Sequence, residues 1–347
     1  MRKLIPHSKP CIGEAEIYAV TAVLKSGMLA QDRETALFEK EASSALGCRH
    51  GAAVNSGTAA LTLALRALGA EGGDVIIPSF VCSSLYHAVL GAQARPVIAD
   101  CDPRTFNIDP ADAKRRLTRR TRAIIAPHMF GLPCDMDALN ALGVAVIEDC
   151  AQSFGARIGK KPAGALGAAA AASFYATKLF TTGEGGLVAS SEKKLVDYVH
   201  RRRDYDNTVP DRPKENCKMT DFQAAMGRVQ LKRLPSFLAW RAAIAGRYDA
   251  AFADSDLTPP EKRPGRIYSR YVLSCPPRRL RGLLEYCAKK GICAHRPVFR
   301  PLHLDVSCGG KFSGTELAWS RALSLPVYPG LTDSDIMYII NAIRNTK

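Results

Sequence analysis

Short apolar runs alternate with amphipathic segments of helical length over the first two thirds of the chain. The runs are rich in β-branched residues and occur at the start of segment 51–70 and within segments 73–80, 94–102, 121–128 and 143–150. Between them lie segments such as 59–68, in which apolar residues recur at helical spacing. This alternation predicts parallel β-strands buried on both faces and joined by crossover helices.

Two further strands are predicted at 169–175 and 185–190, on either side of a lysine-containing turn. Helical patterns then extend from about residue 192 to 247, interrupted by a loop at 206–216. After residue 257 the pattern becomes a strand (267–275), a helix (278–290), an irregular stretch and two terminal helices. We therefore predict an α/β fold. A large, mainly parallel sheet domain with an N-terminal helical segment would span residues 1–250, and a smaller C-terminal α/β domain residues 251–347.

Composition indicates an ordinary globular protein, with 47% hydrophobic and 23% charged residues in 347. The eleven cysteines include no CxxC pair, so neither a zinc site nor a disulfide framework is indicated. Reduced thiols, the lack of an apolar leader at the N-terminus and the lack of any run of eighteen apolar residues predict a cytoplasmic protein without membrane spans.

The chain carries 48 Lys and Arg against 33 Asp and Glu, a formal net charge of +15. Such a balance suggests an anionic partner, either a nucleic acid or a phosphorylated small molecule. The basic runs at 113–122, 200–205 and 259–266 occur in separate segments and lack interleaved aromatic residues. We therefore expect solvated surface or steering of a small anionic ligand, and no nucleic-acid partner.

Three polar positions follow predicted strands, where ligands of open α/β sheets bind. The sequence Ser56-Gly57-Thr58 ends a strand and opens a helix, which suits an anion, although a threonine helix cap is a commoner explanation. Asp149 ends an apolar strand, where a carboxylate needs a cation or several donors; a helix cap or a structural ion pair is its simpler interpretation. Lys178 lies between an apolar run and a glycine-rich turn, and desolvation there would make its amine a nucleophile.

Together these positions fit pyridoxal 5'-phosphate (PLP). This cofactor needs a lysine for its aldehyde, a carboxylate for its pyridinium nitrogen and a helix N-terminus for its phosphate. Lys178, Asp149 and the Gly57-Thr58 turn supply these three groups, so we predict a PLP site.

The chain also resembles the DegT/DnrJ/StrS class of PLP-dependent sugar aminotransferases, which have the type I aminotransferase fold. The resemblance covers nearly the whole chain. It is carried by the blocks "KPCIGEAEIYAVTAVLKSGMLAQ", "AVNSGTAAL", "VIIPSFVCSS", "PVIADCD", "IEDCAQSFGA", "SFYATKLFTTGEGG", "ENCKMTDFQAAMGRVQL", "RPLH" and "LSLPVYPGLT".

The resemblance implies a role for individual residues. Lys178 would be the Schiff-base lysine and Asp149 the partner of the pyridinium nitrogen, with Gln152 near the ring hydroxyl. The phosphate would be held by Gly57, Thr58 and Ser173, and by Asn216 of the neighbouring subunit in a homodimer that shares its active sites.

Three positions depart from the family pattern. The resemblance implies that Cys82 lies over the cofactor ring, where an aromatic residue is common in the family, so ring stacking is not expected there. Lys218 replaces an arginine, so a bidentate contact is not expected. Asp32 replaces a glycine in a loop that borders the sugar site. For His128 and His303 a structural role is expected over a catalytic one. Glu184 is also expected to be structural.

The family resemblance implies transfer of an amino group from glutamate to a keto-sugar, linked to a nucleoside diphosphate. Three alternatives remain at this stage. A sugar dehydratase of the same scaffold would carry histidine in place of Lys178. A keto-cyclitol aminotransferase fits the same residues, and a DNA-binding or sensory regulator would explain only the charge. No pair of histidines has metal-ligand spacing, so no metal is expected.

Overall fold

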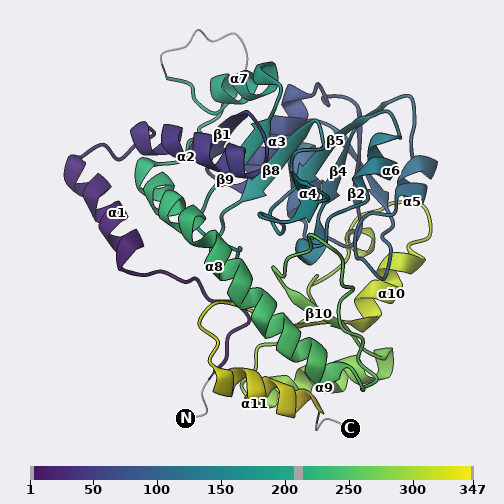
Figure 1. The fold of residues 1–347 in the computed structure, drawn as a ribbon. Helices are drawn as coiled ribbons and strands as arrows, with labels where there is room; N and C mark the ends of the chain where they lie inside the picture. The colour runs from purple at the N-terminus through teal and green to yellow at the C-terminus, as the bar shows by residue number, and fades with distance from the viewer. Residues whose placement is uncertain (1–3, 207–213, 345–347) are drawn as a thin grey trace.

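A computed structural model describes residues 4–206 and 214–344 (Figure 1). Within these ranges, seven strands form one sheet in the order β1-β9-β8-β5-β4-β2-β3. The strands are β1 (His50–Val54), β2 (Asp74–Pro78), β3 (Arg95–Ala99), β4 (Thr121–Pro127), β5 (Ala145–Asp149), β8 (Ala169–Ser173) and β9 (Gly186–Ser190). Only β9 runs antiparallel to its neighbours β1 and β8. The prediction of a large, mainly parallel sheet is confirmed.

Helices surround this sheet and build the lower part of the molecule in Figure 1. They are α1 (Glu14–Ser26), α2 (Arg33–Ala45), α3 (Gly57–Ala67), α4 (Ser84–Gly91), α5 (Pro110–Arg115), α6 (Met136–Asn140), α7 (Lys193–Arg202), α8 (Asp221–Phe252), α9 (Pro277–Lys289), α10 (Ser313–Arg321) and α11 (Asp333–Arg344). Two small sheets complete the fold: β6 (Arg157–Ile158) with β7 (Lys161–Pro162), and β10 (Tyr271–Ser274) with β11 (Ala322–Leu325). Of the loop predicted at 206–216, residues 207–213 lie outside the described residues.

The C-terminal part differs from the prediction in one element. The two terminal helices are separated by β11, which pairs antiparallel with β10. A four-residue strand that is fully buried and closed by Pro326 has no alternation that would identify it in a sequence. The predicted strand 267–275 shortens to the four residues of β10, because the segment before it is irregular.

Helix α8 extends along both parts of the molecule and is 32 residues long. Its first half packs on α1 and α2, while Tyr248 and Phe252 near its end join the hydrophobic cluster of β10, β11, α9 and α11. Ile5 belongs to the same cluster, and its backbone pairs with residues 291 and 293. The N-terminal segment therefore packs with the C-terminal part, although it lies more than 280 residues away in sequence.

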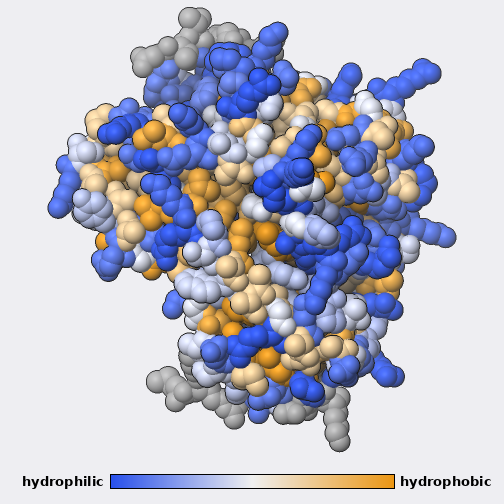
Figure 2. Space-filling model, viewed as in Figure 1, coloured by the Kyte–Doolittle hydropathy of each residue, from blue (hydrophilic) through white to orange (hydrophobic). Residues whose placement is uncertain are grey.

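Much of the positive charge is neutralised locally. Arg203 is buried against Glu39, Arg116 pairs with Asp112 at 2.6 Å, and Arg228 contacts two glutamates of α2. Figure 2 shows hydrophilic side chains spread over most of the visible face, with apolar patches between them. No helix in the described part of the chain is long and apolar enough to cross a membrane.

Candidate active site

A cavity of about 260 Å³ lies at the carboxyl ends of β5 and β8, where α3 begins. This edge is where ligands of open α/β sheets bind. The predicted positions that line it are Gly57, Thr58, Cys82, Asp149, Gln152, Ser173, Lys178 and Glu184. The fold thus brings together residues that lie up to 127 positions apart in the sequence.

The N-terminus of α3 forms one wall of this cavity. Ser56 caps the helix by accepting the Ala59 N–H at 3.1 Å, so the cap is Ser56 and not Thr58. Intrahelical bonds leave the first N–H groups of a helix free, and those of Gly57 and Thr58 remain for a ligand. A Cβ on Gly57 would lie 2.7 Å from the Ser173 Cβ. Glycine is therefore required where these two walls meet.

Asp149 ends β5 at the base of the cavity. Its carboxylate accepts the Ala151 N–H at 3.0 Å, and the side chain is buried. Burial raises the pKa of the Asp149 carboxyl, and the nearby positive charge of Lys178 opposes this shift. A desolvated carboxylate with one backbone donor can still bind a cation or a protonated ring nitrogen.

Lys178 lies in the turn between β8 and β9. The Phe174 carbonyl fixes this turn by accepting bonds from Thr182 N and Thr181 Oγ1. Burial lowers the pKa of the Lys178 amine, the negative charge of Asp149 opposes this, and the positive charge of Arg270 lowers it further. A lysine that loses its proton more readily is a better nucleophile at neutral pH.

Two further predicted residues complete the lining. The Gln152 side-chain oxygen is buried without a hydrogen-bond partner among the described residues. An orphaned acceptor at a cavity wall is free to bind a donor on a ligand. The Cys82 side chain is exposed at the other side, where its thiol contacts the Ser84 hydroxyl at 2.9 Å.

The lining of this cavity does not include Asp32, His128, Asn216, Lys218 or His303. Asn216 is exposed, and its carbonyl accepts a bond from the Asn55 amide at 3.4 Å. His128 is buried and bridges Glu148, at 3.0 Å, and the Cys134 N–H. Because His128 Nδ1 accepts that N–H, the proton must be on Nε2, which donates to Glu148. His303 packs instead on Ser79, with 2.7 Å between Nδ1 and Oγ.

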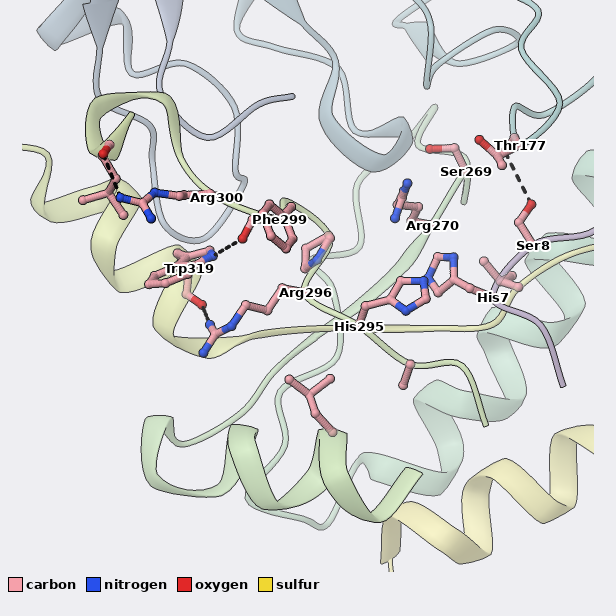
Figure 3. A pocket seen from close by; sticks show the side chains of 15 residues that line it. His7, Ser8, Thr177, Ser269, Arg270, His295, Arg296, Phe299, Arg300 and Trp319 are labelled. Carbon is pink, nitrogen blue, oxygen red and sulfur yellow. Dashed lines mark hydrogen bonds between the residues drawn. The ribbon is translucent and has the colours of Figure 1, made fainter. Parts of the chain in front are cut away.

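A second cavity, of about 1150 Å³, adjoins the first one, since Lys178 lines the small cavity and Thr177 the large one. Apart from Thr177, its walls come from the N-terminal segment and the C-terminal part, as Figure 3 shows. Its polar and aromatic lining includes His7, Ser269, Arg270, His295, Arg296, Phe299, Arg300 and Trp319.

No motif in the sequence singles out these residues. A lone arginine before a short strand, as in Ser269-Arg270-Tyr271, is a common pattern on protein surfaces. The pairing of the N-terminal segment with residues 291–293 and a hydrogen bond between His7 Nε2 and Ser324 Oγ, at 2.8 Å, bring His7 to this site.

Comparison with known proteins identifies the family. The profile of the DegT/DnrJ/EryC1/StrS aminotransferase family matches residues 10–344. The spore coat polysaccharide biosynthesis protein SpsC of Bacillus subtilis (strain 168) is 35% identical over 378 aligned positions, which cover 98% of this chain and 96% of SpsC.

Solved structures agree with this match. The aminotransferase TlmJ from Streptoalloteichus hindustanus superimposes with a TM-score of 0.94 at 28% identity, over 99% of this chain and 98% of TlmJ. Spr1654 from Streptococcus pneumoniae, solved in its PLP-form, superimposes with a TM-score of 0.92 at 26% identity, over 99% and 98% of the two chains. The chain therefore belongs to the DegT/DnrJ/EryC1/StrS aminotransferase family and is a PLP-dependent transaminase.

Proposed function

We propose that this transaminase moves an amino group from an amino acid, glutamate, to a keto-sugar carried on a nucleoside diphosphate. One observation carries the proposal: the cavity that holds Lys178 and Asp149 opens beside a much larger cavity lined by arginines and aromatic side chains. The small cavity suits a cofactor, and the large one suits a bulky anionic substrate. The relative SpsC has a name that refers to polysaccharide biosynthesis.

The small cavity fits PLP in three respects. The free N–H groups at the start of α3, the Thr58 hydroxyl and Ser173 would hold the phosphate, and Gly57 leaves room for it. The orphaned Gln152 oxygen would accept the ring hydroxyl. Asp149 would pair with the protonated ring nitrogen, and that contact would compensate the desolvation of its carboxylate.

When bound, the cofactor supplies an electron sink for the pair of electrons left on the substrate carbon that loses its proton. Lys178 would hold the cofactor aldehyde between turnovers. In each half-reaction its amine, freed by the substrate nitrogen, would move a proton to and from that carbon. Burial favours this role because it lowers the pKa of the amine. Cys82 would pack against the ring without stacking on it.

The large cavity would receive the acceptor. The Arg296 guanidinium lies 4.4 Å from the centre of the Trp319 ring, and Phe299 is 92% exposed at the rim. Arginine pairs with phosphate oxygens, and aromatic faces stack on bases. A diphosphate and its nucleoside would therefore bind at this end, with the keto carbon directed towards Lys178.

The active form would be a homodimer in which Asn216 of one subunit reaches the phosphate of the other. Two observations favour this. Asn216 is exposed, so it is available to another subunit. Helix α1, which forms the left flank in Figure 1, and the turn after it expose Ile17, Tyr18, Leu24 and Met28. Exposed apolar side chains gathered on one element are typical of an interface.

We also propose that residues 1–250 and 251–347 act as a large cofactor-binding domain and a small domain that closes the substrate cavity. Location in the cytoplasm would suit the eleven cysteines, all of which are free.

Visible absorption of the purified protein tests the function. The wild type is expected to be yellow, and glutamate is expected to bleach it as the amino group moves to the cofactor. Lys178→Ala should lack the band of lysine-bound cofactor, whereas Lys193→Ala, on exposed helix α7, should keep it. A Lys178→Ala protein with the wild-type band would overturn the lysine assignment.

The bleached protein can then be used to identify the amino acceptor. Nucleoside-diphosphate-linked 3- and 4-keto-hexoses should restore the yellow colour, with the amino sugar detected by mass spectrometry. Restoration by a keto-cyclitol and by none of the sugar nucleotides would overturn the proposed acceptor and favour the cyclitol alternative.

A further inference from the structure

Arg270 is a largely enclosed cation without a counter-charge. It lies directly before β10 and lines the large cavity, near enough to Lys178 for its positive charge to lower the pKa of that amine. Over the residues that the structure describes, no carboxylate pairs with its guanidinium, and no hydrogen bond to it is found. Burial lowers the pKa of Arg270. A desolvated guanidinium in this position is costly unless a ligand supplies an anion.

The neighbours of Arg270 do not supply that anion. His7 and His295 stack with ring centres 4.2 Å apart, and Figure 3 shows the guanidinium close to both rings. Burial lowers the pKa of His7 to about 2, and it also lowers the pKa of His295, so both rings are neutral at physiological pH. Lys178 is itself a basic group and supplies no negative charge. The thiol of Cys82 lies in the same region.

A second donor beside Arg270 is also unused. The Ser269 hydroxyl is buried without a hydrogen-bond partner among the described residues, and Ser269 lines the same cavity. Two adjacent residues therefore present a hydroxyl and a guanidinium to one space. This combination suits a carboxylate, which accepts several hydrogen bonds through two oxygens.

The backbone that carries this pair is held firmly. Arg241 of α8 is buried, and its Nη1 donates to the carbonyls of Ser269, at 3.1 Å, and Val327, at 2.6 Å. The segment before β10 is thus tied to the long helix and to the residues that follow β11. A preorganised donor pair binds an anion without a further ordering cost.

We propose that Arg270 and Ser269 form the carboxylate subsite for the amino donor, and for the 2-oxo acid that it becomes. This rests on glutamate being the donor in the proposed function. The position favours the donor over the acceptor. A carboxylate of an amino acid lies within a few bonds of the reacting carbon, as Arg270 lies near Lys178. A diphosphate lies farther from the keto carbon and suits the Arg296 end of the cavity.

Titration of the yellow holoenzyme with L-glutamate tests this subsite. Arg270→Gln is expected to raise the half-saturating glutamate concentration roughly 30-fold or more, as for loss of one partner from a buried charge pair. Arg270→Lys should give a smaller increase, because the charge remains but the fork is lost. The matched control is Arg281→Gln, on the exposed face of α9, which should behave as the wild type.

Titration with L-alanine shows which of the two carboxylates of glutamate Arg270 binds, because alanine has only the carboxylate next to the amino group. If Arg270 binds the carboxylate next to the amino group, Arg270→Gln weakens the binding of alanine and of glutamate alike. If it binds the distal carboxylate, only glutamate weakens. Either pattern supports the subsite, whereas unchanged titrations for both amino acids in Arg270→Gln would overturn it.

Binding of glutarate, which has no amino group, provides a readout that does not depend on turnover. Glutarate should raise the thermal midpoint of the wild-type and Arg281→Gln holoenzymes, and it should not raise that of Arg270→Gln. An equal rise in all three proteins would overturn the subsite. If instead the wild type ignores glutamate and glutarate but reacts with another amino acid, the proposed donor is wrong, and that result is distinct from loss of the effect in Arg270→Gln alone.

Discussion

Gly57 and Ser173 meet so closely that a Cβ on residue 57 would lie 2.7 Å from the Ser173 Cβ and 3.1 Å from its Oγ. The contact joins the start of α3 to the end of β8. Residues at this meeting point line the cavity that we assign to the cofactor. The shape of this cavity therefore depends on residue 57 having no Cβ.

Gly57→Ala is expected to force these two walls apart and weaken cofactor binding at least tenfold. The measurement is the fraction of cofactor retained after dialysis, read from visible absorption. Gly246→Ala is the matched control, since a Cβ there meets no atom within 4 Å and lies in α8. It should retain the cofactor and stabilise the fold by about 0.5–1 kcal/mol. Full retention in Gly57→Ala would contradict the assigned phosphate position.

Asp149→Asn should slow the glutamate half-reaction about 100-fold, the scale of losing one preorganised electrostatic contact. Stopped-flow absorbance measures this rate. An unchanged rate would remove Asp149 from the role of ring-nitrogen partner.

The same variant has the opposite effect on the stability of the cofactor-free protein. Burial raises the pKa of Asp149 above its ordinary 3.8, so its ionised form costs stability at neutral pH. Asp149→Asn should therefore raise the thermal midpoint at pH 7, and the gain should shrink as the pH falls towards 3.8. Asp197→Asn is the control with the opposite sign, because Lys193 lowers the pKa of that exposed carboxylate.

Glu148→Gln is expected to destabilise the fold by about 3 kcal/mol at pH 7. Burial would raise the pKa of Glu148, but the bonds from His128 and from the N–H groups of Gly164 and Gly167 outweigh it and lower the pKa. The carboxylate thus stabilises the fold above pH 4.5, and this contribution is lost as the pH falls below that value.

Urea unfolding of wild type and Glu148→Gln at several pH values checks this prediction. The difference between the two should be largest near neutrality and should shrink in acid. Glu285→Gln, in an exposed pair with Arg281, is expected to leave stability close to that of the wild type, because solvent screens the pair. A Glu148→Gln protein as stable as that control would show that the bonds to the ionised Glu148 carboxylate do not stabilise the fold.

Ser79→Ala should separate the two half-reactions. Ser79 Oγ shares a hydrogen bond with His303 Nδ1 at 2.7 Å and accepts the His303 backbone N–H at 3.2 Å, and the Ser79 carbonyl accepts the Leu302 N–H. Losing the hydroxyl should cost about 1–3 kcal/mol and loosen the segment that includes Leu304, at the wall of the large cavity.

The KM for the keto-sugar should therefore rise in Ser79→Ala while the glutamate half-reaction stays as in the wild type. Ser320→Ala, which removes a local bond on α10, serves as the control and should leave both unchanged. A slower glutamate half-reaction would show that the bond also supports the cofactor side.

The parallel sheet could be predicted because its strands are buried on both faces, which leaves continuous apolar runs between helices. The residues at the carboxyl ends of those strands share one edge for the same topological reason. The site positions of Asp149 and Ser173 could thus be predicted from their place at strand ends. That of Lys178 could be predicted from the turn that separates β8 from β9.

The substrate side could not be predicted in the same way. His7, Arg270 and His295 come from three segments whose meeting depends on long-range pairing, and none of these segments has a motif. Ser56 could have been identified as the cap of α3, since serine before a helix start is the preferred residue. Strand β11 was missed because four buried residues carry no periodicity.

The backbone pairing of Ile5 with residues 291 and 293 also sets an order of events during synthesis. The ribosome releases the cofactor-side residues Gly57 to Lys178 well before the segments that carry Arg270 and His295. The N-terminal residues emerge first, yet their partners follow after more than four fifths of the chain. A nascent chain can thus gather its cofactor wall early, but the substrate wall closes only near the end of translation.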